Sequence, residues 1–229
     1  MASFSTTTTI ANPGISRGED GRPEYGTRLR RARLGLLVAL TPILMLFVSF
    51  TSAYVVRQGL PTLDPRTNNL IRDWIPVALP RLLLLNTFVL LVSSVSMELA
   101  RRQHQSEVAL ATFSPVGGTS AGKIRMPWLA VTLVLGLAFL FGQWTAWQQL
   151  AANGFYVATT PSSSFVYLLT GAHAAHLLGG VLALIVAGIA SLLHRSLKTR
   201  SIVVDVTAWY WHFMAVLWIY IFCLMKFVR

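Results

Sequence analysis

"AWYWHFMAVLWIYIF" (208–222) decides the fold class, because these fifteen residues hold three Trp, two Tyr and two Phe around a single histidine, His212. A segment so apolar and so poor in charge is typical of a helix that spans a lipid bilayer. An ionisable side chain at membrane depth is costly and usually has a function. His212 therefore allows three interpretations: a ligand of a metal or haem, a proton carrier, or a contact between helices.

The composition extends this conclusion to the whole chain. Of its 229 residues, 54% are hydrophobic and 12% are charged, and the mean hydropathy is +0.59. A soluble domain usually carries about 25% charged residues. The formal net charge of +11 does not indicate nucleic-acid binding, because Lys and Arg lie in the polar segments between apolar runs, where lipid headgroups select them. The sequence predicts an integral membrane protein with no nucleic-acid partner.

Five apolar runs are long enough to cross the hydrocarbon core, which takes about 20 helical residues. We expect an all-α, polytopic membrane protein with a five-helix domain at 34–229, and helices at approximately 34–56, 77–100, 127–150, 165–193 and 203–228. Residues 1–33 have no signal-peptide core and are rich in Ser, Thr, Gly and Pro, so we expect a flexible polar cytoplasmic tail. Cys223 is the single cysteine, which excludes an intrachain disulfide.

The basic residues predict the orientation. Most of the 19 Lys and Arg side chains flank the apolar runs on the side of the N-terminus, and the segment "QQLAANGFYVATTPSSS" (148–164) has none. Because cytoplasmic loops carry the excess of Lys and Arg, we expect a cytoplasmic N-terminus and an outer C-terminus.

His173 and His176 lie three residues apart in the fourth run and therefore share roughly one helix face. A metal site would normally need a third protein ligand. The nearest carboxylates, Glu98 and Asp205, lie near the cytoplasmic ends of their helices, and no Cys–Cys or His–carboxylate constellation is visible. We expect these histidines to form interhelical hydrogen bonds, each worth about 0.6 kcal/mol in a membrane, with metal binding as the alternative.

A haem ligated by histidines of two helices is a further alternative. Measured from the expected helix midpoints, His176 and His212 differ in depth by roughly 9 Å. A shared iron needs both imidazoles at one depth, so the offset argues against this haem. We expect His212 to bond to a neighbouring helix or to a lipid headgroup.

Other features inside the runs predict packing. Gln143 needs a hydrogen-bond partner on another helix, and Pro42 is expected to kink the first helix. A stripe of small residues in the fourth run predicts a close-packing face: Gly171, Ala175, Gly179 and Ala183.

Side chains near the ends of the runs predict contacts with lipid headgroups. Trp74, Trp128 and Trp209 are typical interface anchors. Arg101 and Arg102, with the basic flank "TRLRRARLG" (27–35), should attract anionic headgroups, at about 1 kcal/mol per basic side chain. The alternative is that these bases only set the topology.

Four segments carry a family resemblance: "LPRLLLLNTFVLLVSSVSMELARR" (79–102), "GQWTAWQQL" (142–150), "FVYLLTGAHAAHLLGG" (165–180) and "AWYWHFMAVLW" (208–218). Together and in this order they resemble subunit III of haem–copper oxidases, most closely cytochrome c oxidase subunit 3. The resemblance covers roughly 34–229, and each motif alone would be weak.

The resemblance implies an accessory, non-catalytic subunit of an oxidoreductase complex in a bacterial plasma membrane. Such a subunit carries no haem or copper, binds phospholipid, supports proton uptake and stabilises the catalytic subunit I. Subunit I would hold the haem and copper, and subunit II and a cytochrome c or other electron donor would complete the assembly. Many members have seven helices, so this chain resembles the five-helix form that begins at the third.

Two departures from the family pattern concern carboxylates. Pro42 stands where the family usually has a glutamate, and Ala215 stands where an aspartate commonly follows the Tyr-Trp-His-Phe motif that contains Trp211 and His212. Glu98 and Asp205 remain the candidates for a proton-related role. These departures favour lipid binding and stabilisation over proton collection. The alternatives are a haem b anchor of a respiratory dehydrogenase, a quinol oxidase subunit III and a small transporter.

Overall fold

The computed structural model describes residues 25–63, 69–71, 74, 80–113, 128–157, 159–192 and 197–227. Within these ranges it contains five long helices: α1 (Tyr25–Gly59), α2 (Leu82–Phe113), α3 (Trp128–Ala152), α4 (Pro161–Leu192) and α5 (Leu197–Phe227). All five are long and apolar enough to cross a membrane, which confirms the predicted helical, multi-pass class. A two-residue strand pair, β1 (Thr62–Leu63) and β2 (Leu70–Ile71), adds a short antiparallel ribbon that the sequence did not predict.

The helices extend beyond the apolar runs that predicted them. α1 begins at Tyr25 rather than at 34, so residues 25–33 are helical. Apolarity marks the part of a helix that meets hydrocarbon, whereas Arg, Leu and Ala in this flank are good helix formers that continue the helix beyond it. Residues 1–24, and the expected boundaries at 77, 127, 193 and 228, lie outside the described residues.

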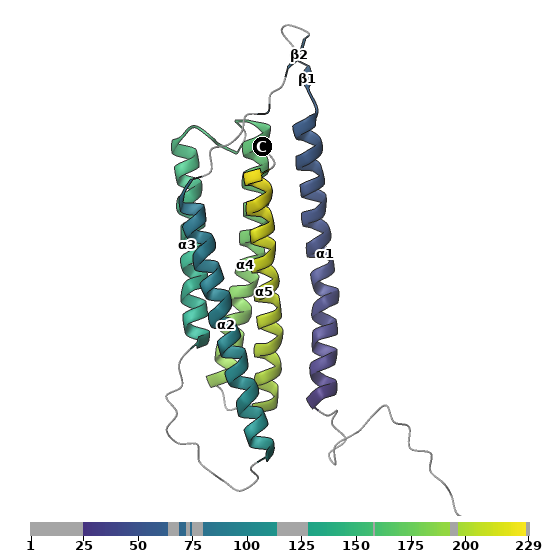
Figure 1. Ribbon diagram of the computed structural model, residues 1–229, viewed down its shortest axis with the longest axis vertical. Coiled ribbons are helices and arrows are strands. Elements are labelled where there is room, and N and C mark those ends of the chain that lie inside the picture. The colour runs from purple at the N-terminus through teal and green to yellow at the C-terminus, as the bar shows by residue number, and fades with distance from the viewer. Residues whose placement is uncertain are drawn as a thin grey trace, which may run out of the picture.

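α5 is the centre of the bundle. It contacts α1, α2 and α4, while α2 also packs along α3 and α3 along α4. Half of the residues in the most apolar window of α5 are buried, against 11% in that of α1. Figure 1 accordingly shows α1 running along one side of the other four helices, with the β1–β2 ribbon beyond its end. α1 continues through Pro42 as one helix.

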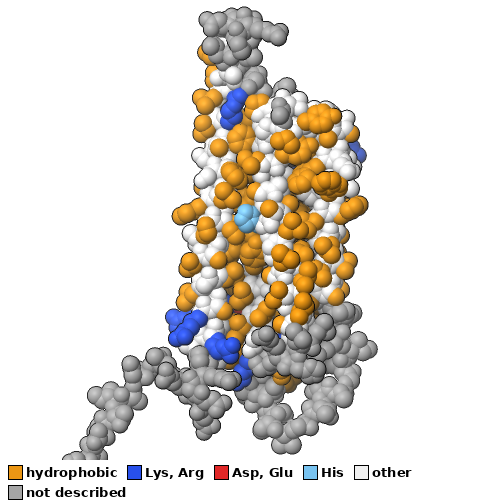
Figure 2. All heavy atoms as spheres, turned by 180° about the vertical axis from the view of Figure 1, so that it is seen from behind, with side chains coloured by type: hydrophobic (Ala, Val, Ile, Leu, Met, Phe, Trp, Pro, Cys, Tyr) orange, Lys and Arg blue, Asp and Glu red, His pale blue; other side chains and the backbone are white. Residues whose placement is uncertain are grey.

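The membrane-facing surface is apolar. Figure 2 shows hydrophobic side chains over the middle of one face, with Lys and Arg near the two ends and most of them at the end at which α1 begins. This pattern suits a protein surrounded by lipid, because exposed apolar residues cost little in hydrocarbon while charged ones belong at the headgroups.

Local signals explain the sharp turn between α3 and α4. Gly154 has a φ of 83° and donates its N–H to the carbonyl of Ala151, which ends α3 in a conformation that glycine adopts without strain. Thr160 then caps α4: its hydroxyl accepts the N–H of Ser163, and the N–H of Thr160 donates to the Ser163 hydroxyl. Pro161 occupies the first helical position, where its missing N–H costs nothing.

The buried face of α4 lies one position away from the predicted small-residue stripe. Ala175 and Gly179 are exposed, whereas Leu177, Gly180 and Leu184 are buried. A Cβ added at Gly180 would lie 3.0 Å from the Tyr210 ring, so this glycine allows the close approach of α5. A stripe of small residues was not enough to identify the face, because Leu177 and Leu184 pack on the same side as Gly180.

Candidate functional site

A buried carboxylate at one end of the bundle joins three helices. Asp205 of α5 is completely buried, and Arg33 of α1 donates to both of its oxygens, with Nε at 2.7 Å and Nη2 at 2.8 Å. From α2, Arg101 donates to Asp205 at 3.3 Å and Gln105 at 3.0 Å. Because a buried charge is tolerated only when it is paired and hydrogen-bonded, Asp205 makes the positions of α1, α2 and α5 interdependent.

Glu98 is the second carboxylate of this charged network. Arg101 donates to it from Nε at 2.7 Å and Nη2 at 2.8 Å, and Arg102 donates from Nε at 2.8 Å. Arg101 therefore bridges Glu98 and Asp205. Its guanidinium is occupied by two carboxylates, whereas the side chain of Arg102 is 73% exposed and can also reach a headgroup.

His212 joins α5 to α2 beside this network. Its Nδ1 lies 2.6 Å from the Ser94 hydroxyl, and its Nε2 lies 3.5 Å from Glu98. The structure thus forms a His–carboxylate pair that the sequence analysis did not recognise. Ser94 and Glu98 are four residues apart, so both face His212 from one side of α2. That spacing was the only signal in the sequence, because the sequence does not give the register between α2 and α5.

His173 occupies a different environment. It is fully buried, with its ring 4.9 Å from that of Trp218 on α5 and 5.9 Å from that of Phe139 on α3. Neither ring nitrogen has a hydrogen-bond partner among the described residues. The expected interhelical hydrogen bond is therefore replaced by contacts between aromatic rings.

His176 contacts its own helix and α1. Its Nδ1 lies 2.7 Å from the carbonyl of Ala172 in its own helix, and its ring packs at 5.8 Å on Phe47 of α1. Its backbone carbonyl accepts the Tyr210 hydroxyl at 2.8 Å, which ties α4 to α5. The three histidines thus have separate partners, and no group of three or more potential metal ligands occurs among the described residues.

Trp211 is held between two glycines. A Cβ added at Gly136 of α3 would lie 2.7 Å from its ring, and one at Gly180 of α4 would lie 3.3 Å from it. Its Nε1 donates to the Ser93 hydroxyl on α2 at 3.2 Å. Trp211 is therefore a packing residue that four helices share.

Gln143 is buried, as expected, but its carbonyl oxygen has no hydrogen-bond partner among the described residues. Polar contacts between α2 and α3 are instead made by Ser93 and Ser96, which bond to Thr132, and by Asn86, whose amide donates to the carbonyl of Phe139 at 3.0 Å. Asn86 lies against Gly142, where a Cβ would be 2.3 Å from the amide oxygen. Asn86 was not among the residues predicted to join helices, although amide side chains and small residues are both common at interhelical contacts in membranes.

The interface anchors show two kinds of contact. Trp209 is half exposed and lies under the Arg33 guanidinium, 5.8 Å from ring centroid to Cζ. Trp74 packs edge-on against Tyr54 at 5.0 Å. Trp128 is the first residue of α3.

These contacts define a multi-pass helical membrane protein whose described polar residues mainly join helices to one another. The chain belongs to the cytochrome c oxidase subunit III family, whose model matches residues 26–228. The resemblance of the sequence motifs is thereby confirmed, and the family is a subunit of a multi-subunit cytochrome c oxidase complex.

Relatives from bacteria and plants match most of the chain. It is 27% identical over 198 residues to the probable cytochrome c oxidase subunit 3 of Mycobacterium leprae, covering 86% of this chain and 87% of the relative. The corresponding Nocardia farcinica protein is 25% identical over 97% of this chain and 100% of its own length. The cytochrome c oxidase subunit 3 of Triticum aestivum is 27% identical, with 83% of this chain matching 66% of the plant protein.

Proposed function

We propose that this chain is the accessory, non-catalytic subunit III of a respiratory haem–copper oxidase and that it stabilises the catalytic subunit I. The observation that carries the proposal is the pairing of Asp205 and Glu98 with Arg33 and Arg101. Carboxylates engaged in this way hold helices in place. Haem and copper, and the reduction of oxygen, then belong to partner subunits of the family's complex.

The proposal includes a bacterial plasma membrane with the charged network on the cytoplasmic side. The excess of basic residues at that end supports this orientation. Arg28, Arg30 and Arg31 are exposed on the first turns of α1. Together with Arg102 they form a basic surface, which we assign to the headgroups of anionic phospholipids.

We assign support of proton uptake to Glu98 rather than to Asp205. Asp205 is fully buried and bonded to three side chains, so its proton exchange with water is hindered. Glu98 is partly exposed and lies 3.5 Å from the His212 ring, a group that can carry a proton. Held as a carboxylate by Arg101 and Arg102, Glu98 can attract a proton from water toward the His212 ring while remaining tied to the bundle.

The test compares the oxidase purified with this chain and after its selective removal. Both preparations should have the same haem and copper content and a similar initial rate of oxygen consumption. The preparation without the chain should lose activity faster during turnover. Loss of haem from the depleted oxidase, or identical rates of inactivation, would contradict the stabilising role.

A further inference from the structure

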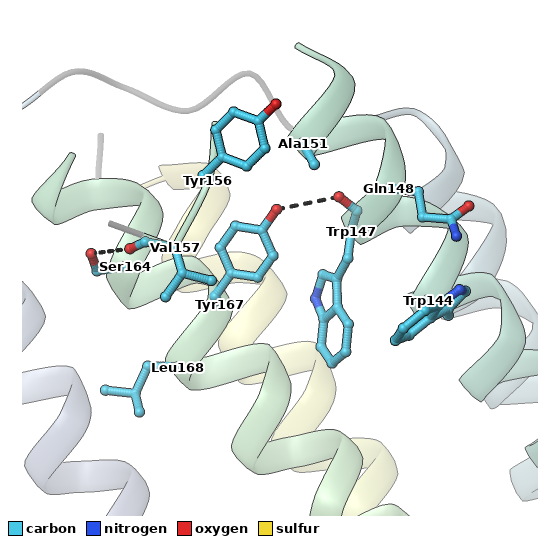
Figure 3. Close-up of a pocket in the computed structure, with 9 residues that line it drawn as sticks. All are labelled: Trp144, Trp147, Gln148, Ala151, Tyr156, Val157, Ser164, Tyr167 and Leu168. Carbon is cyan, nitrogen blue, oxygen red and sulfur yellow. Dashed lines mark hydrogen bonds between the residues drawn. The ribbon is translucent and has the colours of Figure 1, made fainter. Parts of the chain in front are cut away.

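A pocket lies at the opposite end of the bundle from the charged network. It has a volume of about 790 Å³ and opens between the last turns of α3, the turn that follows and the first turns of α4. Ligand pockets in proteins usually measure about 300–1,000 Å³, so this one is large enough for a small molecule or one lipid chain. Figure 3 shows the side chains that surround it.

Aromatic rings form much of the wall. The ring centroids of Trp144 and Trp147 are 6.4 Å apart, and those of Trp147 and Tyr167 are 6.2 Å apart. Figure 3 shows these rings and Leu168 around one space, with Tyr156 at its margin. Such walls offer a ligand dispersion contacts with flat apolar surfaces.

Most polar atoms within the wall already have partners among the described residues, and the indole N–H of Trp144 is an exception. The Tyr167 hydroxyl lies 3.2 Å from the carbonyl of Trp147 and 3.0 Å from that of Phe155. The Trp147 indole donates to Thr170 at 3.0 Å, and the Ser164 hydroxyl donates to the carbonyl of Val157. The part of a ligand that lies against Tyr167, Trp147 and Ser164 must therefore be apolar, because the polar atoms of these side chains are already bonded.

The margin of the pocket is polar but uncharged. The side chains of Gln148 and Tyr156 are exposed there, and none of the described lining residues carries a charge. Headgroups with a net negative charge are attracted by Lys and Arg. Arg57, Arg81 and Lys226 lie at this end of the bundle but do not line the pocket. The margin thus suits a polar group without net charge.

The depth of the pocket fits a lipid. Trp144 lies about 12 Å along α3 from Ala152 at the helix end, so the pocket reaches from headgroup depth into the hydrocarbon. Trp and Tyr concentrate at this level of a membrane.

We propose that this pocket binds one hydrocarbon chain of a lipid whose headgroup has no net charge, and that the headgroup lies at Gln148 and Tyr156. This site is separate from the basic surface at the start of α1. The pocket selects a ligand by its shape and by the absence of net charge, whereas the basic surface selects anionic headgroups. An experiment can therefore disprove one site without disproving the other.

The test uses phosphatidylcholine with a photoreactive diazirine in one acyl chain, added to the full chain in nanodiscs. Illumination should label residues 144–168, and the labelling should saturate and be competed by unlabelled phosphatidylcholine. Ala151→Phe fills the pocket and should lower the yield at least fivefold. Ala152→Phe is the matched control, because Ala152 is the adjacent residue and does not line the pocket; its yield should equal that of the wild type.

Two results would overturn the proposal. The first is labelling that rises in proportion to the probe's share of the bulk lipid, without saturation or competition, which indicates ordinary surrounding lipid. The second is stronger labelling by phosphatidylglycerol with the same diazirine chain, which contradicts a headgroup without net charge. Saturation and competition are measured on the wild type, so both results can be read even where Ala151→Phe does not fold.

Discussion

Arg33 of α1 donates two hydrogen bonds to Asp205 of α5, across a separation of 172 residues in the sequence. A second tie between the same helices joins Tyr25 and Ser201, whose hydroxyl oxygens are 3.0 Å apart. The described residues of α1 that are buried are Leu40, Phe47 and Tyr54, so these polar contacts add to a small apolar interface in holding α1 against the bundle.

Arg33→Gln should loosen the contact of α1 with the bundle without unfolding the other four helices. Breaking a buried ion pair costs about 3–5 kcal/mol, but Arg33 is 38% exposed and Asp205 keeps Arg101 and Gln105. We therefore expect a loss of about 1–3 kcal/mol. It is measured as faster proteolysis of the segment between α1 and α2, together with a lower thermal midpoint.

The control for this variant is Arg31→Gln, which removes the same charge from an exposed position on α1. It should leave both measurements unchanged. Equal effects of the two substitutions would show that the charge of the flank matters and the contact with Asp205 does not.

Gly136→Ala should destabilise the bundle because its methyl group would lie 2.7 Å from the ring of Trp211. Trp211 cannot move aside easily, since Gly180 packs on the same ring system. Overpacking of this kind costs about 1–3 kcal/mol, measured by unfolding in a denaturing detergent. Gly188→Ala has no atom within 4 Å of the added Cβ and should be neutral; similar losses for both would contradict the close contact.

His173→Phe should keep or raise the stability of the protein. Burying a polar group without a hydrogen bond costs about 1–3 kcal/mol, and phenylalanine preserves the ring between Phe139 and Trp218. His212→Phe is the comparison, because it loses the bond to Ser94 and should be destabilised. A clear loss of stability in His173→Phe would show that His173 has a partner that this account lacks.

Arg28→Gln, Arg30→Gln and Arg31→Gln combined should weaken the retention of anionic phospholipid. At about 1 kcal/mol per basic side chain, the triple variant should lose roughly 100-fold in affinity. Native mass spectrometry of the detergent-purified protein titrated with phosphatidylglycerol measures this change. Lys226→Gln, at the other end of the bundle, is the control, and equal retention by the triple variant and the wild type would assign these arginines to topology alone.

The sequence predicted the helices better than the contacts between them. Apolar runs identify membrane spans because hydrocarbon requires about 20 apolar residues, whereas the helical flank that contains Arg33 carries no such signal. The His212–Glu98 contact and the packing of Gly180 depend on the rotation of each helix and on the register between neighbouring helices. The spacing of small or polar residues within one helix specifies neither. Asn86 and the pocket beside Trp144 were missed for the same reason, since both arise from residues of two elements.

The optical spectrum and metal content of the isolated full chain test the central claim most directly. The separate partners of His173, His176 and His212 predict a chain without a haem Soret band and without stoichiometric copper. The oxidase from which it was removed should retain both. A stoichiometric haem in the isolated chain, lost in His173→Ala or His212→Ala, would contradict the account and support a haem-binding membrane anchor.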